Sequence, residues 1–185
     1  EQNWVLNGLK IDDVQSHHDF ISLRLDPEGP SPSPYQRDAI YLNVTDIEFD
    51  NFSLVESSDD TFSVFRLTDI GLRVYSSSFR SVSLNRGMFV SIEESMVPVL
   101  FKNSRFDNFL GDYASARFFS KARMDYLQES LYPEANGTVR SHPLFASFFL
   151  INNLFSGTWT FRESPQTIDL NVPNAFIINN TFRNF

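Results

Sequence analysis

The stretch FIINNTFRNF, at residues 176–185, decides the fold because the chain repeats it. Four further copies lie upstream: FLINNLFSG at 149–157, VLFKNSRFDNF at 99–109, LRV followed by FRSV within 72–82, and LNV followed by FDNF within 42–52. Each copy has two apolar residues two positions apart, a short polar stretch, a Phe and then two small or charged residues. Apolar residues at positions i and i+2 are typical of a strand with one buried face.

The copies recur at a nearly constant interval. They begin at positions 42, 72, 99, 149 and 176, and the long step from 99 to 149 leaves room for a degenerate copy at 126–131. A weaker first copy is found at Leu9-Lys10-Ile11. Such a repeat predicts an all-β solenoid, a parallel β-helix of about seven coils with a period of about 27 residues, which forms one domain over residues 1–185.

Stacking the copies produces three columns of equivalent residues. A buried aromatic ladder is predicted from Phe49, Phe79, Phe106, Phe155 and Phe182. A bend of positive φ is predicted two positions later, at Asn51, Ser81, Asn108, Gly157 and Asn184. The column between them alternates in charge, as Asp50, Arg80, Asp107, Ser156 and Arg183. An antiparallel β-sandwich would also need many turns, but it gives no reason for one motif to repeat in register.

The motifs IINNTFRNF and FLINNLFSG resemble coils of the right-handed parallel β-helix proteins of the pectin-lyase-like superfamily. The resemblance covers residues 40–185 and implies a right-handed coil, in line with the general preference of parallel crossovers. Members of this superfamily commonly bind or act on polysaccharide outside the cell. The fold also occurs in adhesins and tail spikes, so the resemblance implies no single activity.

Two segments interrupt the repeat. Residues 27–36 read PEGPSPSPYQ and predict a surface loop, because proline cannot donate a hydrogen bond to a sheet. Residues 110–141 contain either a degenerate coil or a helical insertion with a loop. The Ala, Arg, Lys, Gln and Leu content of 113–132 favours a helix, whereas the repeat spacing favours a coil, which is the interpretation that we prefer.

Composition excludes several classes of partner. The net charge is −8 and the pI is about 4.8, which argues against nucleic-acid binding and against an anionic membrane surface. Without Cys the chain has neither disulfides nor thiolate metal sites, and no apolar run is long enough for membrane insertion. Because the sequence opens with Glu1, we expect it to be processed or cut from something longer.

Two groups of oxygen and nitrogen ligands could suggest metal sites: His17 and His18 beside Asp12, Asp13 and Asp19, and the pair Asp59 and Asp60. Adjacent histidines on a strand point to opposite faces, so the first group is predicted to be a solvated polar edge. The second pair supplies too few oxygens for calcium and fits a turn. We therefore predict no metal and no cofactor.

No catalytic residue is predicted. The resemblance implies that a lyase of this fold would need a Lys or Arg base, and the only lysines are Lys10, Lys102 and Lys121. No pair of carboxylates has the spacing of a glycosidase dyad, and no nucleophile motif is present.

Four glycosylation sequons begin at Asn43, Asn51, Asn136 and Asn179. A chain rich in Asn, Ser and Thr produces such triplets by chance. Asn136 is the best candidate for a glycan, because the loop predicted at 133–138 is exposed, whereas Asn51 belongs to the bend column.

These features favour a non-enzymatic structural or interaction solenoid at the cell surface or outside the cell, as a building block of a fibre, appendage or adhesin. The final copy is followed by no capping segment, so we expect head-to-tail contact with copies of the chain or with adjoining solenoid segments. The alternative is a secreted β-helix that binds or degrades polysaccharide. A groove with aromatic platforms and clustered Arg would favour that alternative.

Overall fold

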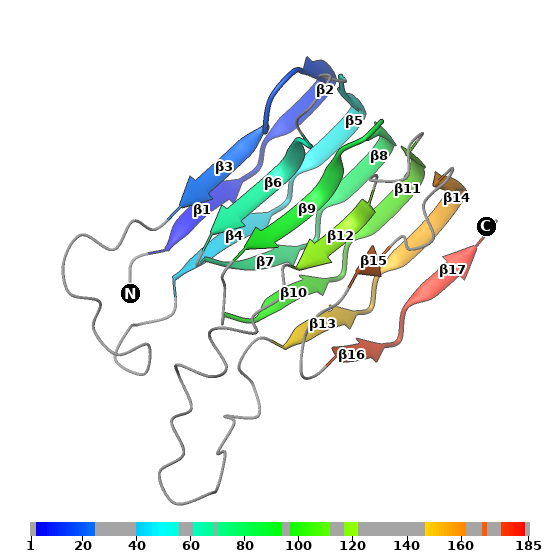
Figure 1. Cartoon of the computed structure of the whole chain (residues 1–185). Coiled ribbons are helices and arrows are strands. Elements are labelled where there is room, and N and C mark those ends of the chain that lie inside the picture. Colours follow the sequence, from blue (N-terminus) through cyan, green and yellow to red (C-terminus); the bar gives the residue numbers. More distant parts are fainter. Residues whose placement is uncertain are drawn as a thin grey trace, which may run out of the picture.

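The computed structural model describes residues 3–24, 40–55, 61–68, 70–93, 97–111, 117–121, 147–161, 168–169 and 175–183. These residues form seventeen strands in three parallel sheets, and they contain no helix. The chain visits the three sheets in turn, so each strand pairs with its equivalent one coil earlier and one coil later (Figure 1). The protein is therefore a parallel β-solenoid.

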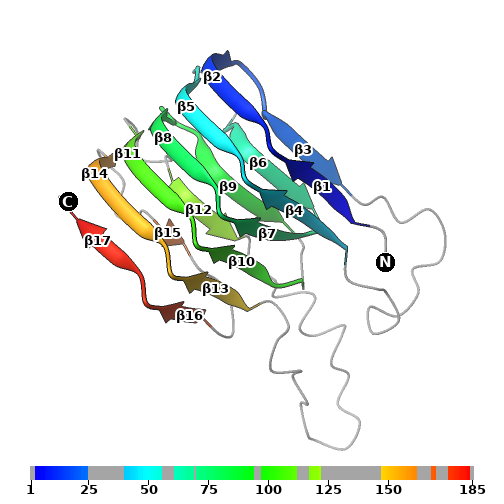
Figure 2. The ribbon, with the colours of Figure 1, turned by 180° about the vertical axis from the view of Figure 1, so that it is seen from behind.

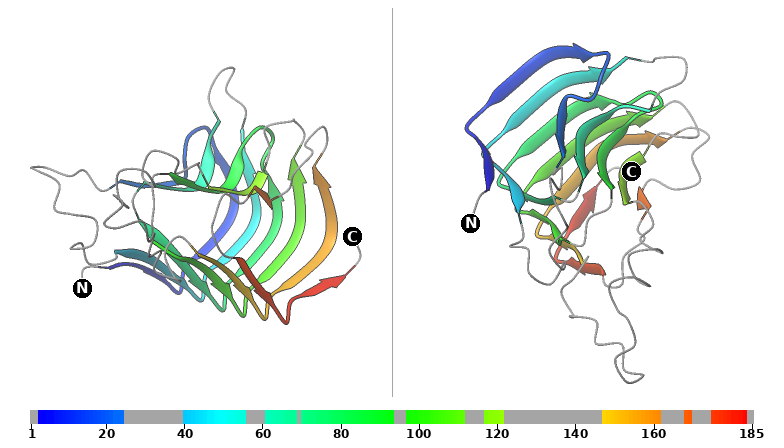
Figure 3. Two further views of the ribbon diagram at one scale, coloured as in Figure 1. Left: turned by 60° about the horizontal axis from the view of Figure 1, so that its bottom comes forward. Right: turned by 60° about the vertical axis from the view of Figure 1, so that its left-hand side comes forward.

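Each sheet takes every third strand. Sheet A contains β1 (Trp4–Asn7), β4 (Tyr41–Thr45), β7 (Gly71–Tyr75), β10 (Val99–Lys102), β13 (Phe148–Ile151) and β16 (Ala175–Ile178). Sheet B contains β2 (Lys10–Ser16), β5 (Glu48–Leu54), β8 (Ser78–Ser83), β11 (Arg105–Gly111), β14 (Leu154–Phe161) and β17 (Thr181–Arg183). Sheet C contains β3 (Ile21–Arg24), β6 (Ser63–Thr68), β9 (Met88–Glu93), β12 (Arg117–Lys121) and β15 (Ile168–Asp169). Seen from behind and obliquely, the three rows of strands enclose the core, and β1 and β17 lie at opposite ends of the stack (Figures 2 and 3).

The described residues form six coils, one fewer than the count of about seven that the sequence predicts. Strand β10 pairs directly with β13, with Val99 opposite Phe148, and β11 pairs directly with β14. No coil therefore lies between the fourth and the fifth, and the long step in the sequence is one coil with a long connection. Strand β12 accounts for part of the ambiguous segment, while residues 126–131 lie outside the described residues, as does the Pro-rich segment 27–36.

Three predicted copies begin at the wrong residue. Phe148 and Ala175, rather than Phe149 and Phe176, lie in the column of Val99, so the last two copies begin one residue earlier than predicted. A shift of one residue exchanges the two faces of a strand, and the sequence could not reveal it because both faces are apolar there. In the first coil, Trp4 pairs with Leu42, so that copy begins at Trp4 rather than at Leu9.

The aromatic ladder is confirmed in its register. Each ladder residue pairs with its equivalent in the next coil of sheet B, in the order Phe49, Phe79, Phe106, Phe155 and Phe182. Ile11 occupies the same position in the first coil. The rings of Phe79 and Phe106 are stacked at 5.3 Å between centroids, and those of Phe106 and Phe155 at 5.0 Å. Phe182 stacks on Phe155 at 4.9 Å, but it is 56% exposed because no described residue covers its other face. The prediction that it is buried is wrong.

The predicted bends are confirmed at the four described positions. Asn51, Ser81, Asn108 and Gly157 have φ of 53°, 54°, 55° and 77°, and Asn184 lies outside the described residues. A second column of positive φ was not predicted: Gly8, Asp46, Ser76, Asn103, Asn152 and Asn179, at the corner between sheets A and B. With Asp13 in the first coil, each of the first five coils therefore has a left-handed residue in both columns.

The charged column provides one ion pair between neighbouring coils. The Nη2 atom of Arg80 lies 2.7 Å from Oδ2 of Asp50. Asp107 is held instead by Arg105 of its own strand at 2.9 Å, and by the hydroxyl of Ser156, which donates to it at 3.0 Å.

We expect Phe106→Ala to lower the free energy of unfolding by about 3–5 kcal/mol, because it opens a cavity between two stacked rings. Chemical denaturation of the dilute protein measures the loss. Phe182→Ala is the matched control from the same column, and its loss should be much smaller because the ring is already 56% exposed. Equal losses would contradict the central role of the ladder.

Asn108→Val should cost about 1–2 kcal/mol more than Asn108→Gly, because a β-branched residue resists φ of 55°. Both variants lose the Oδ1 atom that accepts a hydrogen bond from the N–H of Thr158 at 2.9 Å, so the difference between them isolates the backbone strain. Thermal and chemical unfolding of the two variants side by side tests this, and equal stabilities would argue against a strained bend.

Candidate functional site

The corner between sheets A and B has the same construction in every coil. Two residues connect the strands, and the first of them has a positive φ, as at Asn103 and Asn152. The second turns into the core, as at Ser104 and Asn153, which are 3% and 2% exposed. From the third coil to the sixth, both corner residues are polar, and the first of them is directed to solvent.

The inward residues form a continuous polar column. We call Ser77, Ser104, Asn153 and Asn180 the corner ladder. From the second coil to the fifth, the backbone N–H of the inward corner residue donates to the side-chain oxygen of the next coil: Ile47 to Ser77 at 3.2 Å, Ser77 to Ser104 at 3.3 Å, Ser104 to Asn153 at 3.0 Å, and Asn153 to Asn180 at 2.9 Å. Buried polar groups need such partners, so each coil depends on the side chain of the following coil.

The donors of the ladder are also paired. The side-chain amide of Asn153 donates to the carbonyl of Phe101 and to Oδ1 of Asn180, both at 3.0 Å. The side-chain amide of Asn180 donates to the carbonyl of Leu150 at 2.6 Å. A carboxamide fits this position because it accepts from one backbone and donates to another.

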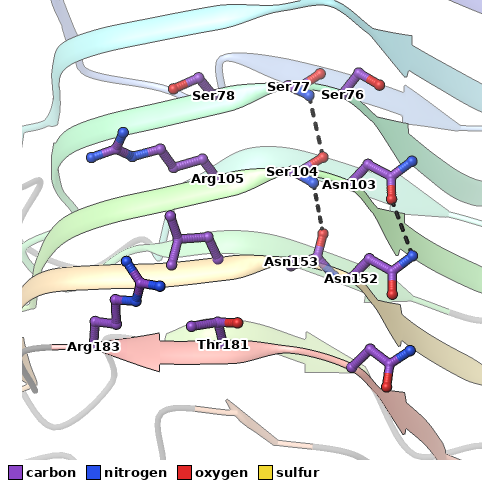
Figure 4. Close-up of a pocket in the computed structure, with 12 residues that line it drawn as sticks. Ser76, Ser77, Ser78, Asn103, Ser104, Arg105, Asn152, Asn153, Thr181 and Arg183 are labelled. Atoms are coloured by element: carbon purple, nitrogen blue, oxygen red, sulfur yellow. Dashed lines mark hydrogen bonds between the residues drawn. The ribbon is translucent and has the colours of Figure 1, made fainter.

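A shallow open groove of about 510 Å³ runs along the outside of the same corner, over the third to the sixth coil. We call it the corner groove, and Figure 4 shows its lining: Ser76, Ser77, Ser78, Asn103, Ser104, Arg105, Asn152, Asn153, Leu154, Asn179, Thr181 and Arg183. Hydroxyl and carboxamide groups predominate. Asn103 and Asn152 lie one above the other, and their side chains are joined by a hydrogen bond of 3.4 Å. The groove can exchange hydrogen bonds with a polar ligand at intervals of one coil.

Apolar side chains lie on the outside of sheet A beside the groove. We call Leu100, Phe149, Ile151, Phe176 and Ile178 the outer apolar strip. The rings of Phe149 and Phe176 are stacked at 4.8 Å with an interplanar angle of 7°. The register correction adds four of these residues to the strip, because the predicted register placed Phe149, Ile151, Phe176 and Ile178 in the core.

The two end coils expose side chains that their equivalents bury. Ile177 is 58% exposed, whereas Leu150, directly before it in the same inward column, is 1% exposed. At the other end, Trp4 is 54% exposed and its column neighbour Leu42 is 1% exposed. Both end coils therefore present the open side of the core.

The predicted polar edge around His17 and His18 is found, and both histidines are exposed. Asp19 accepts a hydrogen bond from the N–H of Ser63 at 2.7 Å and lies 3.3 Å from Arg66, which ties the first coil to the second. Asp13 accepts from the side-chain amide of Asn51, and Asp12 lies 3.8 Å from Lys10. In the described part of the chain, no three His, Asp or Glu side chains are placed to share a metal ion.

The remaining candidates are scattered. Lys10, Lys102 and Lys121 lie on three different sheets, on β2, β10 and β12. Of the sequon residues, Asn43 lies on β4, Asn51 is bonded to Asp13, and Asn179 lines the corner groove. Asn136, Asp59 and Asp60 lie outside the described residues.

The sequence analysis missed the corner ladder, although a signal was present. The pairs Ser76-Ser77, Asn103-Ser104, Asn152-Asn153 and Asn179-Asn180 stand at one fixed distance before the ladder Phe. They were counted only as a polar stretch between strands. Both positions repeat because each has its own requirement. The first residue of the pair adopts a positive φ, and the second places a polar side chain in the interior.

Comparisons with protein-family models, with curated proteins and with solved structures find no match for this chain. Among the residues that the structure describes, no helix has the length and the apolar character needed to cross a membrane.

Asn153→Leu should lower the free energy of unfolding by at least about 2 kcal/mol, because it removes the acceptor of the buried N–H of Ser104 and one donor to the carbonyl of Phe101. Urea denaturation measures the change. Asn152→Gly is the control at the neighbouring, exposed position, where φ of 55° suits glycine, and it should change the stability far less. If the two variants were equally stable, the ladder would not hold the coils together.

Proposed function

We propose that this chain is a non-enzymatic structural or interaction module, which serves outside the cell or at its surface as part of a fibre, appendage or adhesin. The observation that carries the proposal is the exposure of core side chains at the ends of the stack. Ile177 and Phe182 are 58% and 56% exposed at one end, and Trp4 is 54% exposed at the other. Further coils that stack there would bury these side chains.

The physical argument rests on the strand edges as well as on the apolar side chains. An outer strand of a sheet offers unpaired N–H and C=O groups, and such an edge pairs readily with another strand. In the described residues, sheets A and B both end in the sixth coil, at β16 and β17, so a partner coil would gain hydrogen bonds in both of them while it covers the core; the last described strand of sheet C, β15, lies one coil earlier. A contact between two different ends is heterologous and builds a filament or a ring rather than a twofold dimer.

The superfamily assignment belongs to the same proposal. Three parallel sheets visited in turn, with a two-residue corner between two of them, support a pectin-lyase-like β-helix. Its right-handed sense rests on the general preference of parallel crossovers.

Polysaccharide binding is the second candidate, and the corner groove favours it. Amide and hydroxyl groups at intervals of one coil can bond to sugar hydroxyls, and the stacked rings of Phe149 and Phe176 lie on the adjoining face of sheet A. Affinity electrophoresis in gels that contain neutral or acidic polysaccharides tests this candidate. If the groove binds a polysaccharide, that polysaccharide should slow the migration of the wild-type protein. Asn152→Ala should then migrate freely, whereas Ser53→Ala, on another sheet face, should be slowed as the wild type is.

Sedimentation velocity over a range of concentrations tests the assembly proposal. The wild-type chain should associate more as its concentration rises, and Ile177→Lys should weaken the association strongly, because a charge would be buried at the joint. Thr181→Lys is the matched control: it places the same charge in the same coil, at a residue that lines the outer groove. A wild-type chain that stays monomeric at every concentration would overturn the proposal.

A further inference from the structure

The corner ladder determines which coil fits the open edge formed by β16 and β17, and this inference rests on the proposed function. We propose that the edge is completed by a further β-coil that carries Ser, Asn or another oxygen-bearing side chain at the corner-ladder position. The same position in the first coil of this chain is occupied by Leu9. A second copy in its wild-type form is therefore a poorer partner than a coil with a polar corner residue.

The backbone hydrogen bonds place Leu9 in the ladder column. At every coil boundary, the residue after the corner donates its N–H to the carbonyl of the corner residue in the preceding coil. The five bonds are Glu48 to Leu9 at 2.9 Å, Ser78 to Ile47 at 2.8 Å, Arg105 to Ser77 at 2.8 Å, Leu154 to Ser104 at 2.9 Å and Thr181 to Asn153 at 2.8 Å. Leu9, Ile47 and the corner ladder are thus one column, which is apolar in two coils and polar in four.

At the open edge the backbone of Asn180 has no partner in the described part of the chain. Its side chain is fully engaged with the fifth coil, since it accepts from Asn153 and donates to Leu150. The backbone N–H of Asn180 is the equivalent of that of Asn153, which donates to the side-chain oxygen of the next coil. A coil that covers Asn180 without supplying that oxygen would bury an unpaired N–H, which is costly.

In the other columns of sheets A and B that the described residues continue, a second copy fits this edge. Continuing the columns would place Leu6 over Ile177 and Ile11 over Phe182, so apolar side chains would meet. On the outside, Asp12 would lie opposite Arg183, because both belong to the charged column. The partner therefore needs apolar core residues, an acidic residue facing Arg183 and a polar corner residue, and wild-type Leu9 fails only the last condition.

Leu9 is tolerated where it stands because it lies at the other end of the stack. It is 44% exposed, so water can reach the first corner. At a joint between two molecules the same residue would be covered on both sides. The N–H of Asn180 would then be buried without an acceptor. At every boundary from Ile47 to Asn180, the corresponding N–H has a side-chain acceptor.

The test uses the chain as its own probe, with Leu9→Asn and Leu9→Ser as the fitted partners. Sedimentation velocity should show that both variants self-associate about tenfold more tightly than the wild type, because each supplies the acceptor for the N–H of Asn180. Leu9→Val is the matched apolar control and should associate as the wild type does. Circular dichroism and the unfolding midpoint of the dilute proteins check that each variant is folded. Leu9→Ser serves if Leu9→Asn is not folded.

A second change identifies the surface. Adding Ile177→Lys to Leu9→Asn should remove the gain, since it blocks the opposite end of the joint. If the polar variants associate no more tightly than the wild type, or if the gain survives Ile177→Lys, the ladder does not select the partner and the inference is overturned while the assembly proposal stands. If none of the four proteins associates, both the inference and the assembly proposal are overturned.

Discussion

Parallel stacking in register is the constraint on which the rest of the structure depends. It places each residue directly over its equivalent in the next coil. Each buried side chain must therefore pack against, or bond to, the residue at the same position in the neighbouring coil. Phenylalanine satisfies this condition because rings stack, as Phe79, Phe106 and Phe155 do at 5.0–5.3 Å. Buried polar residues satisfy it only when the side chain of one coil bonds to the backbone of the next, as Asn153 does to Ser104 at 3.0 Å.

The sequence was sufficient for the features that a single residue type marks. The Phe column and the left-handed bend at Asn51 and Asn108 were predictable, because few residues serve at either position. The register of the last two coils was not, since Phe148 and Phe149 are equally apolar and only pairing distinguishes them. Spacing also could not separate one coil with a long connection from two short coils.

The candidate site was less predictable than the fold. The corner ladder is built from Ser and Asn, which also fill ordinary turns, so its role becomes visible only when the bonds between coils are known. The outer apolar strip was hidden by the register error, because a strand that is apolar on both faces gives no sign of which face is outside. The roles of the acidic residues beside His17 and His18 were hidden for a similar reason: the sequence predicts only a solvated polar edge there, whereas Asp13 and Asp19 hold Asn51 and the backbone of Ser63, which are contacts between coils.

The three corners of a coil differ in how far they can vary in length. Between sheets A and B the connection is two residues in all six coils, from Gly8 and Leu9 to Asn179 and Asn180. Between sheet C and the next strand of sheet A it ranges from two residues, after β6, to the long segment that separates β12 from β13. Insertions and deletions can therefore accumulate along one side of the molecule without moving the hydrogen-bonded frame. The chain can in this way carry new surface loops while its pitch and its ability to stack remain unchanged.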